Sequence, residues 1–124
     1  MKKVLVVEDS RFVRAVLQQR LSEQGHTVIT AVDGETGLKL ATEAIPDVIV
    51  IDWIMPKIQG STLLASLRAN PLTAKIPVLV VSGSISGDAT ENALLAGAFG
   101  VLAKSDTVVA DIVSTLAQPI PLLN

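Results

Sequence analysis

Five polar residues of this 124-residue sequence each end or follow a short apolar run, and their types suit the chemistry of a metal ion and a phosphoryl group. They are Glu8, Asp9, Asp52, Ser82 and Lys104. Three clustered carboxylates would repel one another, and a bound cation would remove that repulsion. Because the group offers oxygen ligands without histidine or cysteine, it indicates a hard ion, with Mg²⁺ preferred over Ca²⁺ or zinc.

The hydroxyl and the ammonium group extend this interpretation to phosphoryl transfer. Mg²⁺ and a lysine neutralise the non-bridging oxygens of a phosphoryl group, and a hydroxyl donates a hydrogen bond to one of them. A carboxylate can itself accept the phosphoryl group and become an acyl phosphate. Asp52 is the best placed acceptor, because it ends the most apolar run and leads a turn at residues 53–56 that can fold over the group.

Each of these residues also has a plain structural explanation. An aspartate after a strand often caps the next helix, a serine before a glycine often forms a turn, and a single lysine is usually solvated. The joint pattern favours a site, because all five residues lie at the same end of their predicted strands.

Three apolar runs predict buried strands at Val4–Val7, Val48–Ile51 and Val78–Val81. They are too short for helices, and none alternates apolar with polar residues. This pattern is typical of a parallel sheet covered by helices on both faces. Weaker patterns predict two more strands, at His26–Ala31 and Gly100–Ala103.

Apolar residues at helical spacing fill the gaps between the strands. The first helix has Asp9 or Ser10 as its cap and ends before Gly25. Four more helices are predicted at Gly34–Ala44, Ser61–Ala69, Asp88–Ala98 and Thr107–Ala117. Five repeats of strand and helix predict an α/β fold with a parallel sheet, in which the carboxyl ends of the strands share one edge.

Composition narrows the class of protein. With 49% hydrophobic and 18% charged residues, the chain can build a core and is not disordered. A net charge of -2 argues against direct binding to nucleic acid or to an anionic membrane, and no apolar run reaches the length of a membrane span or a secretory signal. Having no cysteine, the chain makes no disulfide. We expect a cytoplasmic domain at residues 1–117, with 118–124 as a tail or the start of a linker.

Four segments together resemble the receiver domain of bacterial two-component response regulators. They are VLVVEDSRFVR, DWIMPKIQG, VLVVSG and AGAFGVLAK, and the resemblance covers roughly residues 2–117. Each segment alone is moderately specific for this family, but the four segments in this order and at this spacing are highly specific for it. The resemblance implies a flavodoxin-like (βα)5 three-layer sandwich, with a five-stranded parallel sheet in the order 2-1-3-4-5.

The resemblance also implies a role for each acidic residue. Asp52 is the expected phosphoacceptor and a ligand of Mg²⁺. Asp9 would bind Mg²⁺ directly and Glu8 through water. The backbone carbonyl group of Ile54 would be a further ligand.

Ser82, Lys104 and the N–H group of Gly83 would contact the phosphoryl group, and Ile54 is also expected to take part in binding it. The implied donor is a phosphohistidine on a histidine kinase or a histidine phosphotransfer protein, or a small molecule such as acetyl phosphate. The implied function is a phosphorylation switch for protein–protein interactions, with slow hydrolysis of its own phosphoryl group and no turnover of other substrates. The sequence does not name the downstream effector.

The chain departs from the family pattern at four places. Ser105 stands where proline usually follows the lysine, and Val101 stands where the family usually has an aromatic residue. Gln59 replaces the usual aspartate or asparagine before a glycine. Ile54 is apolar where a polar side chain is common, and we expect it to exclude the hydrolytic water and lengthen the phosphorylated lifetime.

Other functions stay open at this point. A phosphorylation-independent interaction module is the main alternative, and Val101 and Ser105 favour it. A Mg²⁺ phosphohydrolase with an aspartyl intermediate is disfavoured, because such enzymes often have a second aspartate where this chain has Ile54. A flavin carrier is disfavoured because Glu8 and Asp9 would repel the flavin phosphate.

Overall fold

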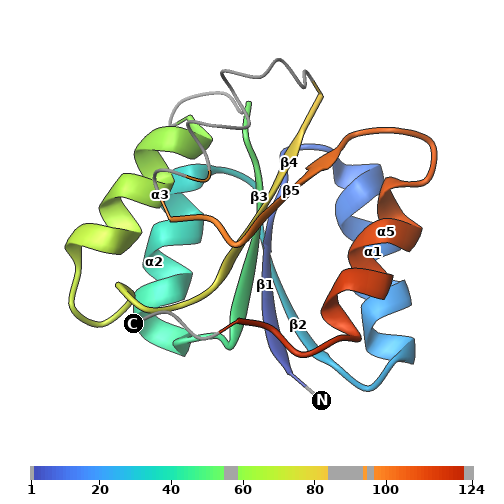
Figure 1. The fold of residues 1–124 in the computed structure, drawn as a ribbon, viewed down its shortest axis with the longest axis horizontal. Coiled ribbons are helices and arrows are strands. Elements are labelled where there is room, and N and C mark those ends of the chain that lie inside the picture. Colours follow the sequence, from blue (N-terminus) through green and yellow to red (C-terminus); the bar gives the residue numbers. More distant parts are fainter. Residues whose placement is uncertain (1, 55–58, 84–93, 95–96, 122–124) are drawn as a thin grey trace.

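Strands and helices alternate along the chain (Figure 1). The computed structural model describes residues 2–54, 59–83, 94 and 97–121. The elements are β1 (Lys3–Val7), α1 (Arg11–Glu23), β2 (Thr27–Ala31), α2 (Gly34–Ala44), β3 (Val48–Asp52), α3 (Gly60–Ala69), β4 (Val78–Ser82), β5 (Gly100–Ala103) and α5 (Val108–Leu116). Each predicted strand is present within one residue of its predicted ends. Four of the five predicted helices are confirmed, and most of the helix predicted at Asp88–Ala98 lies outside the described residues.

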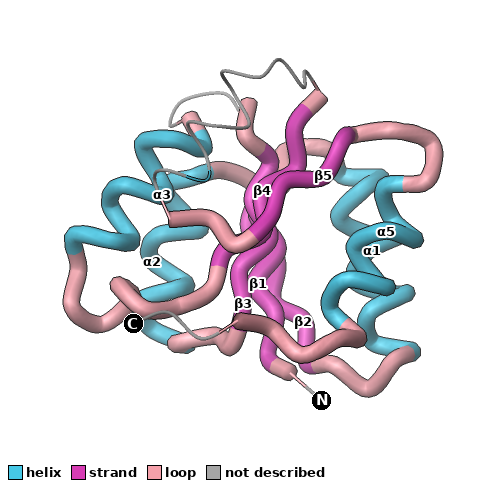
Figure 2. The backbone as a smooth tube through the Cα atoms, viewed as in Figure 1, coloured by secondary structure: helices cyan, strands magenta, loops and turns pink. Residues whose placement is uncertain are grey.

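All five strands are parallel and lie in the order β2-β1-β3-β4-β5, which confirms the flavodoxin-like α/β fold. The sheet is the middle of three layers, with α2 and α3 on one face and α1 and α5 on the other (Figure 2). After β1 the chain first adds β2 on one side and then β3 on the other. The carboxyl ends of β1 and β3 therefore flank the switch point at which such sheets bind ligands.

Alternate residues of the central strands pack into two apolar layers. On β3, Ile49 and Ile51 belong to the layer under α2 and α3, whereas Val48 and Val50 belong to the layer under α1 and α5. Every residue of β3 and β4 is buried. Covering both faces explains why these strands show no polar alternation. Each fully buried aliphatic side chain stabilises the fold by about 1.5–3 kcal/mol, so the central strands give the site a firm base.

Capping residues set the ends of the first two helices. The Ser10 hydroxyl accepts a hydrogen bond from the Val13 N–H group at 3.3 Å, so Ser10 is the cap of α1. Gly25, just beyond α1, has a φ of +90°, which glycine adopts without strain. Asp33 caps α2 in the same way as Ser10 caps α1. The residue after α2, Ile45, is left-handed with a φ of 45°, which is unusual for a β-branched side chain.

The start of α3 packs closely against the backbone of Trp53, the residue after Asp52. The Gly60 N–H group donates a hydrogen bond to the Trp53 carbonyl oxygen at 3.0 Å. A Cβ atom added to Gly60 would lie 2.7 Å from the Trp53 Cα atom. Only glycine allows this approach. The helix α3 begins at Gly60, one residue before its predicted start.

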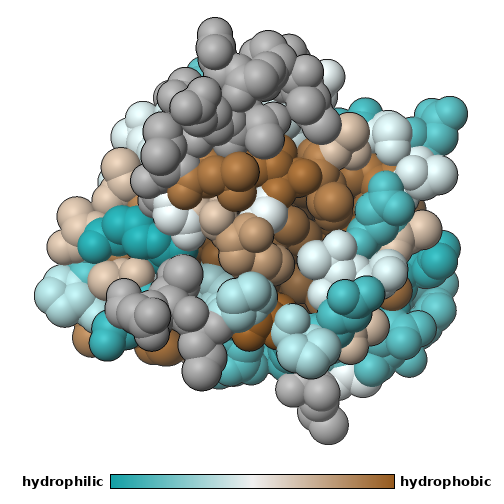
Figure 3. Space-filling model, viewed as in Figure 1, coloured by the Kyte–Doolittle hydropathy of each residue, from teal (hydrophilic) through white to brown (hydrophobic). Residues whose placement is uncertain are grey.

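Apolar residues reach the surface at the open edge of the sheet, where a brown area lies over β5 in Figure 3. The β5 residues Val101 and Leu102 are half-buried. Val101 packs on the α2 and α3 side of the sheet, and Phe99, just before β5, packs on the α1 and α5 side. Within the described ranges, no helix has the length and apolar character to span a membrane.

Candidate functional site

The carboxyl ends of β1, β3, β4 and β5 lie side by side at one edge of the sheet. Three backbone hydrogen bonds continue the ladders past the strands: Glu8 N–H to Ala31 O at 3.0 Å, Trp53 N–H to Val81 O at 2.8 Å, and Lys104 N–H to Ser82 O at 2.9 Å. The polar residues that follow the strands are therefore placed by the sheet itself. This edge brings together the acidic residues, the serine and the lysine that the sequence indicated.

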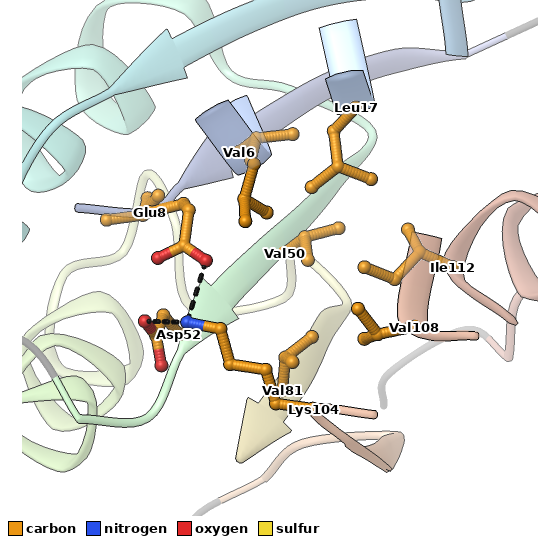
Figure 4. Close-up of a pocket in the computed structure, with 11 residues that line it drawn as sticks. Val6, Glu8, Leu17, Val50, Asp52, Val81, Lys104, Val108 and Ile112 are labelled. Carbon is orange, nitrogen blue, oxygen red and sulfur yellow. Dashed lines mark hydrogen bonds and ion pairs between the residues drawn. The ribbon is translucent and has the colours of Figure 1, made fainter. Parts of the chain in front are cut away.

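Lys104 connects two carboxylates from different strands (Figure 4). Its Nζ atom lies 3.0 Å from Glu8 Oε1 and 3.0 Å from Asp52 Oδ2. Glu8 and Asp52 are almost fully buried, with 4% and 5% of their surface exposed. The Lys104 side chain is 30% exposed. Such a pair is held more firmly than a surface ion pair, because little water competes for the carboxylate oxygens.

Asp9 completes a cluster of three acids. One carboxylate oxygen each from Glu8, Asp9 and Asp52 can be chosen so that all lie within 4.8 Å of one another. Unlike the other two, Asp9 is exposed. The Lys104 ammonium group contacts the carboxylates of Glu8 and Asp52, and no ion pair to Asp9 is seen among the described residues, which leaves negative charge that a divalent cation could balance.

The crowding of acids shifts their protonation. The pKa of Glu8 is raised to about 7, chiefly by burial and also by its contacts with Asp52 and Asp9, against the opposing effect of Lys104. The pKa of Asp9 is lowered, chiefly because Glu8 hydrogen-bonds to it. Burial alone would lower the pKa of Lys104, but its contacts with Glu8 and Asp52 raise it overall. At neutral pH the site therefore holds a protonated lysine beside acids that compete for a proton.

The remaining predicted site residues surround Asp52. The Ile54 N–H group donates a 3.3 Å hydrogen bond to Asp52 Oδ1, while the Ile54 side chain is 59% exposed. Ser82 is buried at the end of β4, next to the β3 strand that ends in Asp52. A Cβ atom added to Gly83 would meet no atom of the described residues within 4 Å. The peptide bond between Lys104 and Ser105 is trans.

Trp53 differs from its neighbours because its side chain turns away from the acids. It is half-buried and packs against the apolar layer under α2 and α3. The backbone of Trp53 lies at the site, whereas its indole ring packs against the apolar layer under α2 and α3. Trp53 directly follows Asp52 in the sequence, but that position does not indicate the orientation of its side chain.

A small apolar cavity of about 10 Å³ lies directly beneath the acids and the lysine. Its walls come from β1, β3, β4, α1 and α5, and its lining residues are Val6, Val7, Glu8, Val13, Leu17, Val50, Asp52, Val81, Lys104, Val108 and Ile112. Figure 4 shows the aliphatic part of Lys104 crossing from β5 toward the carboxylates, with the valines and Ile112 behind it. Apolar walls and a volume of about one water molecule make this void a poor water site.

Arg14 is a neighbour of the site that the sequence did not indicate. Its Nη1 atom donates hydrogen bonds to the backbone carbonyl oxygens of Glu8 at 2.8 Å and Asp9 at 2.9 Å. The available signal was the place of this arginine, in the first turns of a helix that directly follows two acids. Every residue has a backbone carbonyl group, so the position of Arg14 in the sequence does not show which carbonyl oxygens accept its hydrogen bonds.

Comparison with known proteins agrees with this geometry. The family model of the response regulator receiver domain matches residues 4–114. The transcriptional regulatory protein PrrA of Mycobacterium tuberculosis is 42% identical over 102 residues, which are 82% of this chain and 43% of PrrA. A probable chemotaxis protein CheY of Rhizobium etli is 35% identical over 107 residues, which are 86% of this chain and 83% of that protein. The chain thus spans less than half the length of the transcriptional regulators among these relatives.

Solved structures show the same fold. The chemotaxis response regulator CheY4 of Vibrio cholerae superposes with a TM-score of 0.87 at 31% identity, covering 94% of this chain and 97% of that one. The Mn²⁺-bound form of response regulator Rcp1 has a TM-score of 0.84 at 26% identity, with all of both chains covered. With the family match covering almost the whole chain, this protein belongs to the response regulator receiver domains of two-component signalling.

Proposed function

We propose that this chain is a phosphorylation switch, which accepts a phosphoryl group on Asp52 in a Mg²⁺-dependent reaction. The observation that carries the proposal is the Asp52 carboxylate, held between the Lys104 ammonium at 3.0 Å and the carboxylates of Glu8 and Asp9. Asp52 ends a fully buried strand, so the acceptor oxygen is fixed before the donor arrives. Such preorganisation lowers the barrier to phosphoryl transfer.

The reaction moves one phosphoryl group between two atoms. A carboxylate oxygen of Asp52 attacks the phosphorus of a phosphohistidine on a histidine kinase or a histidine phosphotransfer protein. A P–O bond forms, the P–N bond breaks, and the imidazole nitrogen keeps the electron pair of that bond. Lys104 stabilises the charge on the transferring oxygens. Ser82 and the Gly83 N–H group are proposed to donate hydrogen bonds to the same oxygens.

The residues present fit a hard divalent ion. Three carboxylates converge within 4.8 Å, all their donor atoms are oxygen, and one lysine balances only part of their charge. Asp9 and Asp52 would hold Mg²⁺ directly, Glu8 through water, and Ile54 through its carbonyl oxygen. The ion, when bound, would supply positive charge to the transferring phosphoryl group. The Mn²⁺-bound Rcp1 structure is a neighbour in fold that carries a divalent ion.

Phosphorylation would act by shifting the population of two conformations. Ser82 and Lys104 end adjacent strands, so a phosphoryl group held by both would move the segments that follow β4 and β5. Position 101 is a valine, which packs on the α2 and α3 side of the sheet. A switch that depends on the rotation of an aromatic side chain at this position is therefore not proposed. The chain would hydrolyse its own phosphoryl group slowly and is not proposed to turn over other substrates.

The output of the whole protein is a separate question. Some relatives are transcriptional regulators of which this chain spans less than half, whereas it spans most of a CheY-type relative. The downstream effector therefore stays unassigned, and the predicted lack of direct nucleic-acid binding stays a prediction. So do the cytoplasmic location and the division into a domain at 1–117 and a tail or linker at 118–124.

Intact mass spectrometry after incubation with acetyl phosphate and Mg²⁺ tests the proposal. We expect a gain of one phosphoryl group in the wild type, and no gain in Asp52→Asn or when a chelator removes the metal. A folded wild-type protein that gains nothing would favour the phosphorylation-independent interaction module. Turnover of unrelated phosphoesters would favour a phosphohydrolase.

A further inference from the structure

Arg14 occupies an unusual place for an arginine. It lies in the first turns of α1, where the positive end of the helix dipole disfavours a cation, and the first turn contains no acidic residue to compensate. Its side chain is half-buried rather than extended into solvent. Helix stability therefore does not explain its position, and its contacts must be sought outside α1.

Those contacts are the backbone of the acidic segment. Arg14 Nη1 donates to the carbonyl oxygens of Glu8 at 2.8 Å and Asp9 at 2.9 Å, two consecutive peptide groups between β1 and α1. Within the described part of the chain, Arg14 makes no ion pair with a carboxylate. The guanidinium group thus fixes the backbone that carries two acids without neutralising either acid.

Other contacts of this segment hold Glu8 rather than Asp9: the Glu8 N–H group donates to the Ala31 carbonyl oxygen at 3.0 Å, and the buried Glu8 carboxylate pairs with Lys104. The Ser10 N–H group lies 3.4 Å from Glu8 Oε2, a long hydrogen bond, and Ser10 caps α1 through Val13. Asp9 is exposed, so packing does not hold it. Arg14 is therefore the group that ties the Glu8 and Asp9 carbonyl groups to a rigid helix.

We propose that Arg14 is a positioning residue, whose guanidinium group holds the Glu8–Asp9 backbone in the conformation that lets both acids bind a divalent ion. The inference rests on the metal site of the proposed function. Groups that orient metal ligands typically change metal affinity by 10- to 100-fold when they are removed. Because Asp9 is exposed while Glu8 is also held by burial and by its contacts with Ala31 and Lys104, we expect a weakening of roughly 3- to 30-fold.

The sign of the effect separates positioning from charge. Removing a cation near three carboxylates would, by electrostatics alone, strengthen the binding of Mg²⁺. Loss of an anchor would weaken it instead. Arg11 provides the matched control, because it lies in the first turn of α1, is exposed, and forms no hydrogen bond or ion pair among the described residues.

The experiment compares Arg14→Met, Arg14→Lys and Arg11→Met with the wild type by calorimetric titration with Mg²⁺. We expect Arg14→Met to bind Mg²⁺ more weakly, Arg14→Lys to recover part of the loss by donating to one carbonyl, and Arg11→Met to bind as tightly as the wild type or more tightly. Methionine and lysine favour helices as arginine does, and circular dichroism verifies that α1 is intact. Equal or tighter binding by Arg14→Met would overturn the proposal.

Amide hydrogen exchange at Asp9 and Ser10, measured with no metal added, gives an independent readout. Faster exchange in Arg14→Met than in Arg11→Met supports the anchor, and equal exchange overturns it. If the wild type itself fails to bind Mg²⁺, the proposed metal site fails, while the exchange measurement still decides the role of Arg14.

Discussion

The Arg68 guanidinium donates a hydrogen bond to the Gly97 carbonyl oxygen at 2.9 Å and so joins α3 to the segment entering β5. Its Nη1 atom also donates to the carbonyl oxygen of Ile76 at 2.8 Å, just before β4. Gly97 has a φ of +106°, and a Cβ atom there would lie 2.9 Å from Arg68 Nε. One side chain thus fastens the starts of the two strands whose other ends carry Ser82 and Lys104.

Arg68→Met should lower the free energy of unfolding by about 2–3 kcal/mol, because carbonyl groups from two segments lose a charged donor. Gly97→Ala should lower it by about 1–2 kcal/mol through left-handed strain, with a further loss from the contact with Arg68. Urea denaturation measures both. The double variant should lose less than the sum, because each change damages the same junction.

The control for this comparison is Arg20→Met, which removes an exposed cation near the end of α1. Its effect should stay within about 0.5 kcal/mol. An Arg68→Met protein that unfolds at the same urea midpoint as the control would show that these hydrogen bonds do not stabilise the fold.

The raised pKa of Glu8 predicts how stability depends on pH without added metal. Burial raises the pKa to about 7 from an ordinary value of 4.5, so between these pH values the folded chain binds a proton that the unfolded chain releases. Stability therefore falls as pH rises through this window, and Glu8→Gln should flatten the fall. Saturating Mg²⁺ should stabilise the wild type more at pH 8 than at pH 5, because the ion competes with the proton for the carboxylates.

Thermal unfolding between pH 4.5 and 8 measures this effect. Burial lowers the pKa of His26, which adds a slope of opposite sign in wild type and variant alike, so their difference isolates Glu8. Parallel curves for wild type and Glu8→Gln would contradict the assignment of the slope to Glu8.

Ile45 offers a prediction about backbone strain. Its left-handed φ of 45° costs a β-branched residue about 1–2 kcal/mol, and its side chain is 45% exposed, so little packing is lost on removal. Ile45→Gly should raise the free energy of unfolding by about 1 kcal/mol, as measured by urea denaturation. Val32, also β-branched and 49% exposed but without a positive φ, is the matched position. Val32→Gly should destabilise the chain, and equal effects of the two changes would argue against strain at Ile45.

The sequence predicted the strands well because their signal is local. Runs such as Val48–Ile51 and Val78–Val81 are apolar at every position only when both faces of a strand are covered, and the structure buries both faces. The strand order came from the resemblance to the receiver family rather than from the runs, since pairing between distant segments leaves no local pattern. The register that sets Asp52 beside Val81 could be obtained only from the structure.

The sequence predicted the site residues whose reactive side chains directly follow strands. Asp52 and Lys104 were indicated by type and position, and the structure places their charged atoms 3.0 Å apart. Arg14 and Arg68 were not indicated, because both donate to backbone carbonyl groups of other segments, which every residue possesses. The orientation of Trp53 was also hidden, since its packing against the apolar layer under α2 and α3 is a contact between distant segments.

Ile54 sets the last prediction, which concerns the lifetime of the phosphorylated state. Its N–H group lies 3.3 Å from Asp52 Oδ1, and its apolar side chain is mostly exposed beside the acceptor. We expect this side chain to shield the acyl phosphate from an attacking water molecule, to which it offers no hydrogen bond. Ile54→Asn places an amide that can orient water at the same position, so we expect hydrolysis roughly 3- to 10-fold faster, equivalent to about 1 kcal/mol in the barrier.

The decay of the phosphorylated mass after removal of the phosphodonor measures this rate. Ile54→Val is the control, because it keeps an apolar side chain and should decay at the wild-type rate. Both variants keep the backbone carbonyl proposed to bind Mg²⁺, so the initial extent of phosphorylation shows whether the acceptor site is intact. An unchanged decay rate in Ile54→Asn would exclude water shielding by Ile54 and would place control of the lifetime with the groups that hold the phosphoryl oxygens, Lys104 first among them.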